Sequence, residues 1–277
     1  VGVIDSYFPN SDFFREFERF DRHVHKLQRQ GKPIDFISIC SPNYLHDSHV
    51  RFALRSGANV ICEKPLVLNP WNIDGLKEVE AETNCKVNTI LQLRVHPEII
   101  KLRNDIKNNL NDKKHEVDLT YVTARGRWYH QSWKGNIRKS GGIATNIGIH
   151  FFDMLHYMFG NLQENKVHLL EHDRAAGYLE FDQARVRWFL SINIQDVPLL
   201  AREKGQRTYR SITLNETEIE FSGGFKDLHV QSYEKILQNS GFGLEENRVA
   251  IKTVADIRNA EICSFGEQHP FLMELSK

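Results

Sequence analysis

Residues 58–65 read Ala58-Asn59-Val60-Ile61-Cys62-Glu63-Lys64-Pro65, a short apolar run with two charged residues and a proline directly behind it. The run follows a helical pattern that ends at Gly57, so it predicts a buried strand entered from a helix. Another apolar run, 34–40, ends in the same manner at Ser41-Pro42-Asn43. Strands that alternate with helices predict a parallel sheet, and such sheets bind ligands at the carboxyl ends of their strands. We therefore expect Lys64 to face a ligand, although most lysines of this kind lie in solvated loops.

The first 110 residues repeat this alternation of strand and helix. Gly31 and Gly57 mark helix ends, and Asn69-Pro70 supplies a cap followed by a proline in the first helical turn. The predicted strands cover 34–40, 58–62 and 86–91, and the predicted helices cover 13–30 and 44–56 and begin again at 70 and 97.

The pattern changes after residue 111, where apolar and polar residues alternate. Such alternation is typical of a sheet with only one covered face. The predicted elements of this half are strands at 117–123 and 186–192, a hairpin of 207–214 and 217–221 around Asn215-Glu216, and helices at 144–159, 227–239 and 245–260. The last of these helices could pack back on the first half of the chain.

We therefore predict an α/β protein of two domains. Residues 1–110 form a Rossmann-type doubly wound parallel sheet, and residues 111–277 form an α+β domain with a large, open, mostly antiparallel sheet. A dinucleotide-binding fold starts with a strand, a glycine-rich turn, a helix and a second strand that ends in an acidic residue. Residues 1–100 contain no Gly-x-Gly-x-x-Gly. The first domain is thus expected to be incomplete here, with about 35–40 residues preceding Val1.

The composition argues against several classes of function. The 36 basic residues are balanced by 36 acidic ones, so no positive excess favours a nucleic-acid partner. No stretch approaches the ~20 apolar residues of a membrane span. No Cys-x-x-Cys or His-Glu-x-x-His spacing predicts a metal site. We interpret the cysteines as reduced thiols of a cytoplasmic protein.

Four motifs identify a family. They are Ser41-Pro42-Asn43-x-x-His46, Glu63-Lys64-Pro65, Gln92-x-Arg94-x-His96-Pro97 and Gly141-Gly142-Ile143-Ala144-Thr145-Asn146-Ile147-Gly148-Ile149-His150-Phe151-Phe152-Asp153. Each is weak alone, but together they resemble the Gfo/Idh/MocA family of NAD(P)-dependent sugar oxidoreductases over essentially the whole chain. Within it, segments 91–97, 125–129 and 132–134 are most similar to the WlbA/WbpB type, the UDP-N-acetyl-2-amino-2-deoxyglucuronate 3-dehydrogenases of surface-polysaccharide (lipopolysaccharide) synthesis.

The resemblance implies NAD as cofactor and oxidation of the sugar 3-hydroxyl to a ketone. The implied cofactor residues are Ser41, Pro42, Asn43, His46, Glu63, Lys64 and Gln92. Lys64 would stabilise the developing alkoxide, and His150 would be the general base because the pKa of imidazole lies near the operating pH. The third implied catalytic residue, Asn146, stands where the family usually has an aspartate, which leaves neutral Lys64 as a rival base.

The implied substrate is a UDP-sugar acid, whose diphosphate and carboxylate require cations and hydrogen-bond donors. The implied substrate residues are Gln92, Arg94, His96, Arg125, Arg127, Tyr129, Trp133, Lys134, Asn146 and His150. The second domain would bind this substrate and pair across subunits, which gives a homo-oligomer, a tetramer built as a dimer of dimers. Two alternatives stay open: the same chemistry on a free sugar or inositol, and a non-catalytic NAD-sensing or partner-binding protein on the same fold.

Overall fold

The computed structural model describes residues 6–108, 113–219 and 227–275. The predicted domain boundary at 110–111 and the last two residues of the predicted hairpin, 220–221, lie outside these ranges. Within them, no helix combines the length and the apolar character that crossing a bilayer would require.

The first half is built on a parallel sheet, as predicted. Its strands are β1 (Phe36–Ile39), β2 (Asn59–Cys62) and β3 (Val87–Thr89), in the order β1-β2-β3. Val60 packs with helix residues Val50 and Leu54 on one face, whereas Ile61 packs with Ile236 on the other. Both faces are therefore covered, which explains why the strands read as continuous apolar runs rather than as alternating ones.

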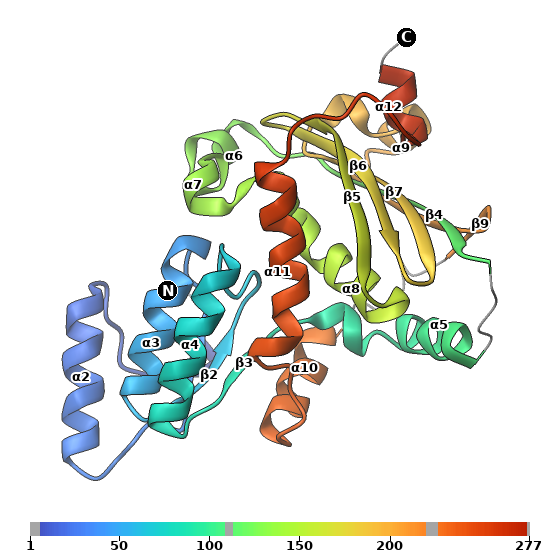
Figure 1. The fold of residues 1–277 in the computed structure, drawn as a ribbon. Coiled ribbons are helices and arrows are strands. Elements are labelled where there is room, and N and C mark those ends of the chain that lie inside the picture. Colours follow the sequence, from blue (N-terminus) through green and yellow to red (C-terminus); the bar gives the residue numbers. More distant parts are fainter. Residues whose placement is uncertain (1–5, 109–112, 220–226, 276–277) are drawn as a thin grey trace.

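Helices α2 (Phe17–Arg29), α3 (His46–Arg55) and α4 (Pro70–Thr83) lie together on the side of this sheet seen on the left of Figure 1. Phe17 of α2 contacts Phe52 of α3 edge to face, with ring centroids 5.0 Å apart. After α3 the chain turns sharply at Gly57, whose φ of 74° lies in the left-handed region that favours glycine. The turn delivers the chain directly into β2, and β2 ends at the loop that carries Lys64.

The second half contains a six-stranded sheet, which confirms the predicted fold class. The strand order is β5-β6-β7-β4-β8-β9, and every pair is antiparallel except β4–β7. Its strands are β4 (His115–Thr123), β5 (Leu162–Leu170), β6 (Arg174–Phe181), β7 (Ala184–Ser191), β8 (Thr208–Leu214) and β9 (Thr217–Glu218). Asn215 and Glu216 have φ angles of 49° and 69°, as a two-residue hairpin turn between twisted strands requires.

Two helices connect the sheets. Helix α8 (Ile149–Phe159) packs on one face of the large sheet, where Phe152 meets Trp188 edge to face at 5.3 Å. It continues a π-helical segment, η4 (Ala144–Gly148). Helix α11 (Leu244–Asn259) stands between the two sheets in the view of Figure 1 and contacts α4 as well as α8. Arg258 of α11 donates to the carbonyl oxygen of Leu68 at 3.1 Å, so the late helix is tied to the first half of the chain.

The remaining elements complete the described part of the chain. The helices are α5 (Pro97–Asn108), α6 (Arg127–Gln131), α7 (Ile137–Ser140), α9 (Leu199–Glu203), α10 (Leu228–Leu237) and α12 (Pro270–Leu275), and the 3-10 turns are η1 (Asn43–Leu45), η2 (Gln92–Val95), η3 (Trp133–Gly135) and η5 (Ile194–Asp196).

Candidate active site

A cavity of about 270 Å³ opens where the carboxyl end of β2 meets the large sheet. The loop after β2 contributes Lys64, the turn η2 contributes Gln92, and the junction of η4 with α8 contributes Asn146 and His150. The complete lining is Lys64, Gln92, Leu93, Tyr121, Arg125, Tyr129, Lys134, Asn146, Ile147, His150, Phe151 and Arg210. Residues from both halves of the chain are thus brought together at the strand end that the sequence indicated.

The charge of this cavity is one-sided. Four lining residues are cationic, namely Lys64, Arg125, Lys134 and Arg210, and among the described residues that line it none is acidic. Lysine and arginine side chains that converge in a partly enclosed space favour an anionic ligand.

Arg210 was not predicted from the sequence. It lies on β8 opposite Tyr121 of β4, and its guanidinium carbon stands 5.4 Å from the centre of the Tyr121 ring. The sequence did contain a signal for it. Arg210, Ile212 and Leu214 are spaced two residues apart on one strand, so Arg210 lies on the same covered face of the sheet as the two apolar residues. A charged residue at such a position usually has a ligand or a partner.

The Lys64 ammonium is held in the cavity by the main chain. Its Nζ donates to the carbonyl oxygen of Asn146 at 3.1 Å. Burial lowers the pKa of Lys64 to about 8; the charge of Glu63 opposes this shift, and Lys134 and Arg125 add to it. At pH 7 Lys64 is therefore mostly protonated and can donate a hydrogen bond, but it loses the proton within the range of ordinary assays.

The Asn146 side chain is fixed by two neighbours. Its Nδ2 donates to the Tyr129 hydroxyl at 2.7 Å, and its Oδ1 accepts from Asn43 Nδ2 at 3.4 Å. These bonds orient the Asn146 amide at the cavity wall.

His150 lies on the same wall, four residues further along. Burial first, and then the charges of Lys64, His229 and Arg210, lower its pKa well below the usual range. The imidazole is consequently neutral at pH 7 and able to accept a proton, which is the state that a general base requires.

The predicted cofactor residues lie at the carboxyl ends of two adjacent strands. Ser41 and Pro42 follow β1, Glu63 and Lys64 follow β2, and Gln92 lines the cavity. Asn43 is turned inward, and its Nδ2 also donates to the carbonyl oxygen of Ser140, which holds α7 against the loop after β1.

The prediction that His46 contacts the cofactor requires correction. Its ring is 1% exposed, with Nδ1 2.7 Å from the carbonyl oxygen of Pro65 and Nε2 2.8 Å from that of Ser41. Burial lowers its pKa. His46 therefore joins the loops after β1 and β2 to each other and supports them.

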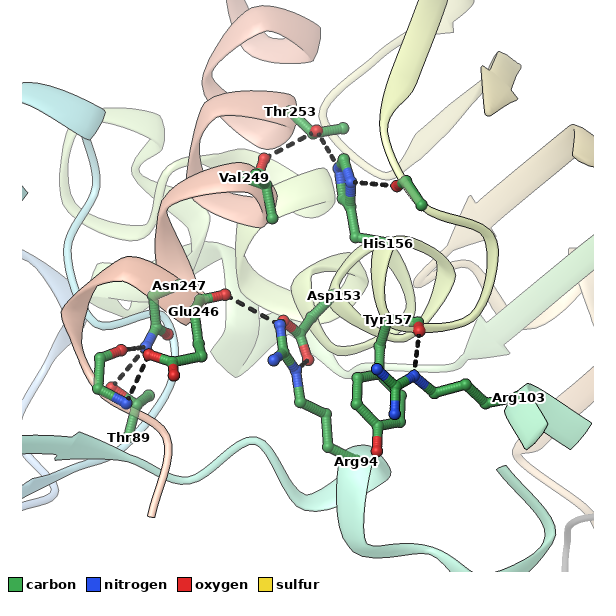
Figure 2. A network of polar contacts seen from close by, with 12 residues as sticks. Thr89, Arg94, Arg103, Asp153, His156, Tyr157, Glu246, Asn247, Val249 and Thr253 are labelled. Carbon is green, nitrogen blue, oxygen red and sulfur yellow. Dashed lines mark hydrogen bonds and ion pairs between the residues drawn. The ribbon is translucent and has the colours of Figure 1, made fainter. Parts of the chain in front are cut away.

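Two predicted substrate residues are likewise buried elsewhere. Arg94 is paired with Asp153 (Figure 2), and the Nδ1 of buried His96 accepts from the backbone N–H of Glu98. Neither lines the cavity, so both predictions require correction. The sequence motif placed these side chains near the site without revealing which way they point.

The other predicted substrate residues lie in or near the cavity. Gln92, Arg125, Tyr129, Lys134, Asn146 and His150 line it. The Lys134 ammonium stands 5.1 Å from the ring centre of Trp128 and 5.7 Å from that of Trp133, so Trp133 supports a lining residue. Arg127 is exposed and is not among the lining residues.

Comparison with known proteins identifies the family. Residues 1–90 match the oxidoreductase family's NAD-binding Rossmann fold, and residues 113–208 match its C-terminal alpha/beta domain. The chain belongs to the Gfo/Idh/MocA oxidoreductase family. This membership confirms the family that the four sequence motifs indicated.

Individual relatives add detail. The chain is 48% identical to the WlbA (WbpB) dehydrogenase from Thermus thermophilus, whose crystal structure contains NAD and UDP-GlcNAcA; the match has a TM-score of 0.93 and covers 98% of this chain and 88% of that one. It is 26% identical to the putative oxidoreductase YteT from Bacillus subtilis, over 59% of this chain and 38% of the relative. It is 28% identical to inositol 2-dehydrogenase from Rhizobium meliloti, over 46% of this chain and 37% of that relative. The chain thus spans under two fifths of these curated relatives.

Proposed function

We propose that this protein is an NAD-dependent dehydrogenase that oxidises the 3-hydroxyl of UDP-N-acetyl-2-amino-2-deoxyglucuronate to the 3-keto sugar. The observation that carries the proposal is the cavity in which a protonated Lys64 and a neutral His150 lie among further cations. The comparison that supports the proposal is the 48% identity to the WlbA (WbpB) dehydrogenase from Thermus thermophilus, which was crystallised with NAD and UDP-GlcNAcA.

The residues at the strand ends fit the cofactor. The Ser41 hydroxyl and the side chains of Glu63 and Lys64 follow β1 and β2, and dinucleotides lie across the carboxyl ends of such strands. NAD, when bound, supplies the acceptor for the hydride. The chain's own residues then have to bind the sugar and manage the proton of its hydroxyl.

Lys64 and His150 divide this work. The Lys64 ammonium donates a hydrogen bond to the sugar oxygen and stabilises the negative charge that grows on it as the hydride leaves. The neutral imidazole of His150 accepts the hydroxyl proton. Neutral Lys64 stays the rival base, and the pH dependence treated in the Discussion separates the two assignments.

Recognition of the substrate falls to the other cations. Arg125, Lys134 and Arg210 line the cavity, and an arginine fork matches a carboxylate with two parallel hydrogen bonds. A free sugar or inositol offers no anionic group to them. Calorimetric titration tests this point: UDP and the UDP-sugar acid should bind, whereas binding of myo-inositol alone would favour the alternative substrate class.

We expect Arg210→Met to raise the KM for the sugar acid about 10- to 100-fold, because a charge-assisted contact to the carboxylate is lost. The KM for the UDP-sugar with a CH₂OH group in place of the carboxylate should change by less than about threefold. Arg207→Met is the matched control, since exposed Arg207 lies three residues earlier and outside the cavity. Equal effects of Arg210→Met on both sugars would assign Arg210 another role.

The proposal extends to assembly and cellular role. The face of the large sheet opposite α8 carries charged pairs such as Arg187–Asp118, with Nε–Oδ1 at 2.6 Å, and this face would pair with a second subunit in a dimer of dimers. A cytoplasmic location and a role in lipopolysaccharide biosynthesis belong to the same proposal.

A further inference from the structure

Arg94 and Asp153 form a buried ion pair outside the cavity. Arg94 Nε donates to Asp153 Oδ2 at 2.9 Å, and Nη2 donates to Oδ1 at 2.7 Å (Figure 2). The two residues are 8% and 1% exposed. Nη2 also donates to the carbonyl oxygen of Glu246 at 2.9 Å. Three elements therefore meet at one guanidinium: η2 through Arg94, α8 through Asp153 and α11 through Glu246.

Aromatic rings and oxygen acceptors together fix the orientation of the Arg94 guanidinium. Its carbon stands 5.2 Å from the ring centres of both Tyr157 and Phe242, so aromatic rings flank it while its edge donates to oxygens. Such an arrangement permits little change in the angle or distance between the elements that it joins. A lysine could supply the charge but not the fork of fixed donors.

Two of the elements joined by the ion pair, η2 and α8, also contribute residues that line the cavity. Gln92 lies two residues before Arg94 in η2, and His150 lies three residues before Asp153, on the adjoining turn of α8. Both Gln92 and His150 line the cavity, whereas Arg94 and Asp153 do not.

The same joint reaches the sheet that carries Lys64. Asn247 follows Glu246 in α11, and its Nδ2 donates to the Thr89 hydroxyl at the end of β3 at 3.0 Å (Figure 2). Strand β3 pairs with β2, whose carboxyl end leads to Lys64. One path from His150 to Lys64 through the protein therefore passes through the Arg94–Asp153 pair, beside the shorter link from Lys64 Nζ to the carbonyl oxygen of Asn146.

We propose that Arg94 and Asp153 are positioning residues, whose ion pair fixes His150 on α8 relative to Gln92 and Lys64 at the end of the parallel sheet. The role of His150 and Lys64 in this inference rests on the proposed function. Misplacement of a reacting group by about 1 Å can cost 10²-fold in rate. The pair thus governs the rate of the reaction without contacting the cavity.

A second ion pair in the chain provides the control. Arg174 and Asp196 are also bidentate, with Nε–Oδ2 at 2.7 Å and Nη2–Oδ1 at 2.8 Å, and they join β6 to η5 without lining the cavity. Asp196 is buried and Arg174 is half-buried. If such bidentate ion pairs matter here only for folding, Arg94→Lys and Arg174→Lys should have the same kind of effect.

The experiment compares these variants in the complete gene product, by kcat, KM and the deuterium isotope effect at the oxidised carbon. For Arg94→Lys we expect kcat to fall at least about 10-fold, a larger isotope effect, and a KM for NAD within about threefold of wild type. For Arg174→Lys we expect a lower melting temperature only. Loss of active molecules would lower kcat and leave the isotope effect unchanged, so this measurement separates position from stability.

A double variant covers the case in which a single variant fails to fold. Arg94→Met with Asp153→Leu removes both charges, and replacing a buried pair with apolar residues of similar size often restores stability. We expect this protein to melt near the wild-type temperature and still to show the low kcat and the larger isotope effect. Wild-type kcat and isotope effect in the folded double variant would overturn the inference.

A readout without turnover keeps the inference distinct from the proposed function. The His150 imidazole can be titrated by NMR with labelled histidine, and in Arg94→Lys its pKa should rise toward the usual value, because the ring leaves its enclosed position near Lys64. An unchanged titration would contradict the positioning role. Wild-type protein that oxidises no UDP-sugar acid would count against the proposed function alone.

Discussion

Replacing Lys64 with methionine should lower kcat by about 10²-fold or more, the cost of removing one donor to a developing oxyanion. Methionine keeps most of the length of the side chain and removes the ammonium that donates to the Asn146 carbonyl oxygen at 3.1 Å. Steady-state kinetics in the complete gene product gives the result. The matched control is Lys77→Met, because Lys77 forms an exposed ion pair with Glu245 away from the cavity. A Lys64→Met enzyme that keeps more than about a third of the wild-type kcat would remove Lys64 from the mechanism.

The pH dependence distinguishes the two roles open to Lys64. Burial depresses its pKa to about 8, so the ammonium is present below that pH and is lost above it. If the ammonium stabilises the alkoxide, kcat/KM should fall as the pH rises through about 8. If neutral Lys64 were the base, kcat/KM would rise over the same interval. Whether kcat/KM falls or rises through about pH 8 in the wild type, this change should be absent in Lys64→Met.

The second large effect is expected at His150. His150→Asn should lower kcat/KM by about 10²- to 10⁴-fold, since the residue that accepts the hydroxyl proton is gone. Because the pKa of His150 lies well below its usual range, the acid limb of the wild-type profile should lie at lower pH than the titration of an ordinary histidine. His156→Asn is the control on the same helix, where burial lowers the pKa to about 4 but the ring bonds Thr253 instead of lining the cavity. Persistence of the same acid limb in His150→Asn would place the base elsewhere.

Much of the fold follows from local patterns in the sequence. The apolar run before Glu63 is buried on both faces, so it had to be an inner part of a covered sheet. Lys64 was proposed because it follows a predicted strand end, whereas His150 was proposed because residues 141–153 resemble a motif of the family. The helix predicted at 144–159 is real, but its first turn is π-helical, which hydrophobic spacing alone does not distinguish from an α-helix.

The orientation of polar residues could not be predicted in the same way. Arg94 and His46 stand in motifs beside true cavity residues, yet one is satisfied by Asp153, 59 positions away, and the other by two backbone carbonyls. Such partners depend on the tertiary fold and leave no local signal. Arg210 is the opposite case, a cavity residue that was not predicted. Its strand belongs to the far half of the chain, and only packing brings it beside Tyr121.

The central claim is that the cavity oxidises an anionic UDP-sugar with NAD. The most direct measurement is the initial rate of NADH formation with three substrates: the UDP-sugar acid, the same UDP-sugar with CH₂OH in place of the carboxylate, and myo-inositol. We predict that kcat/KM for the acid exceeds each of the others by at least about 10²-fold, because only the acid offers a carboxylate to the cations that line the cavity. Equal or faster oxidation of myo-inositol, or NADH formation with none of the three, would contradict the account.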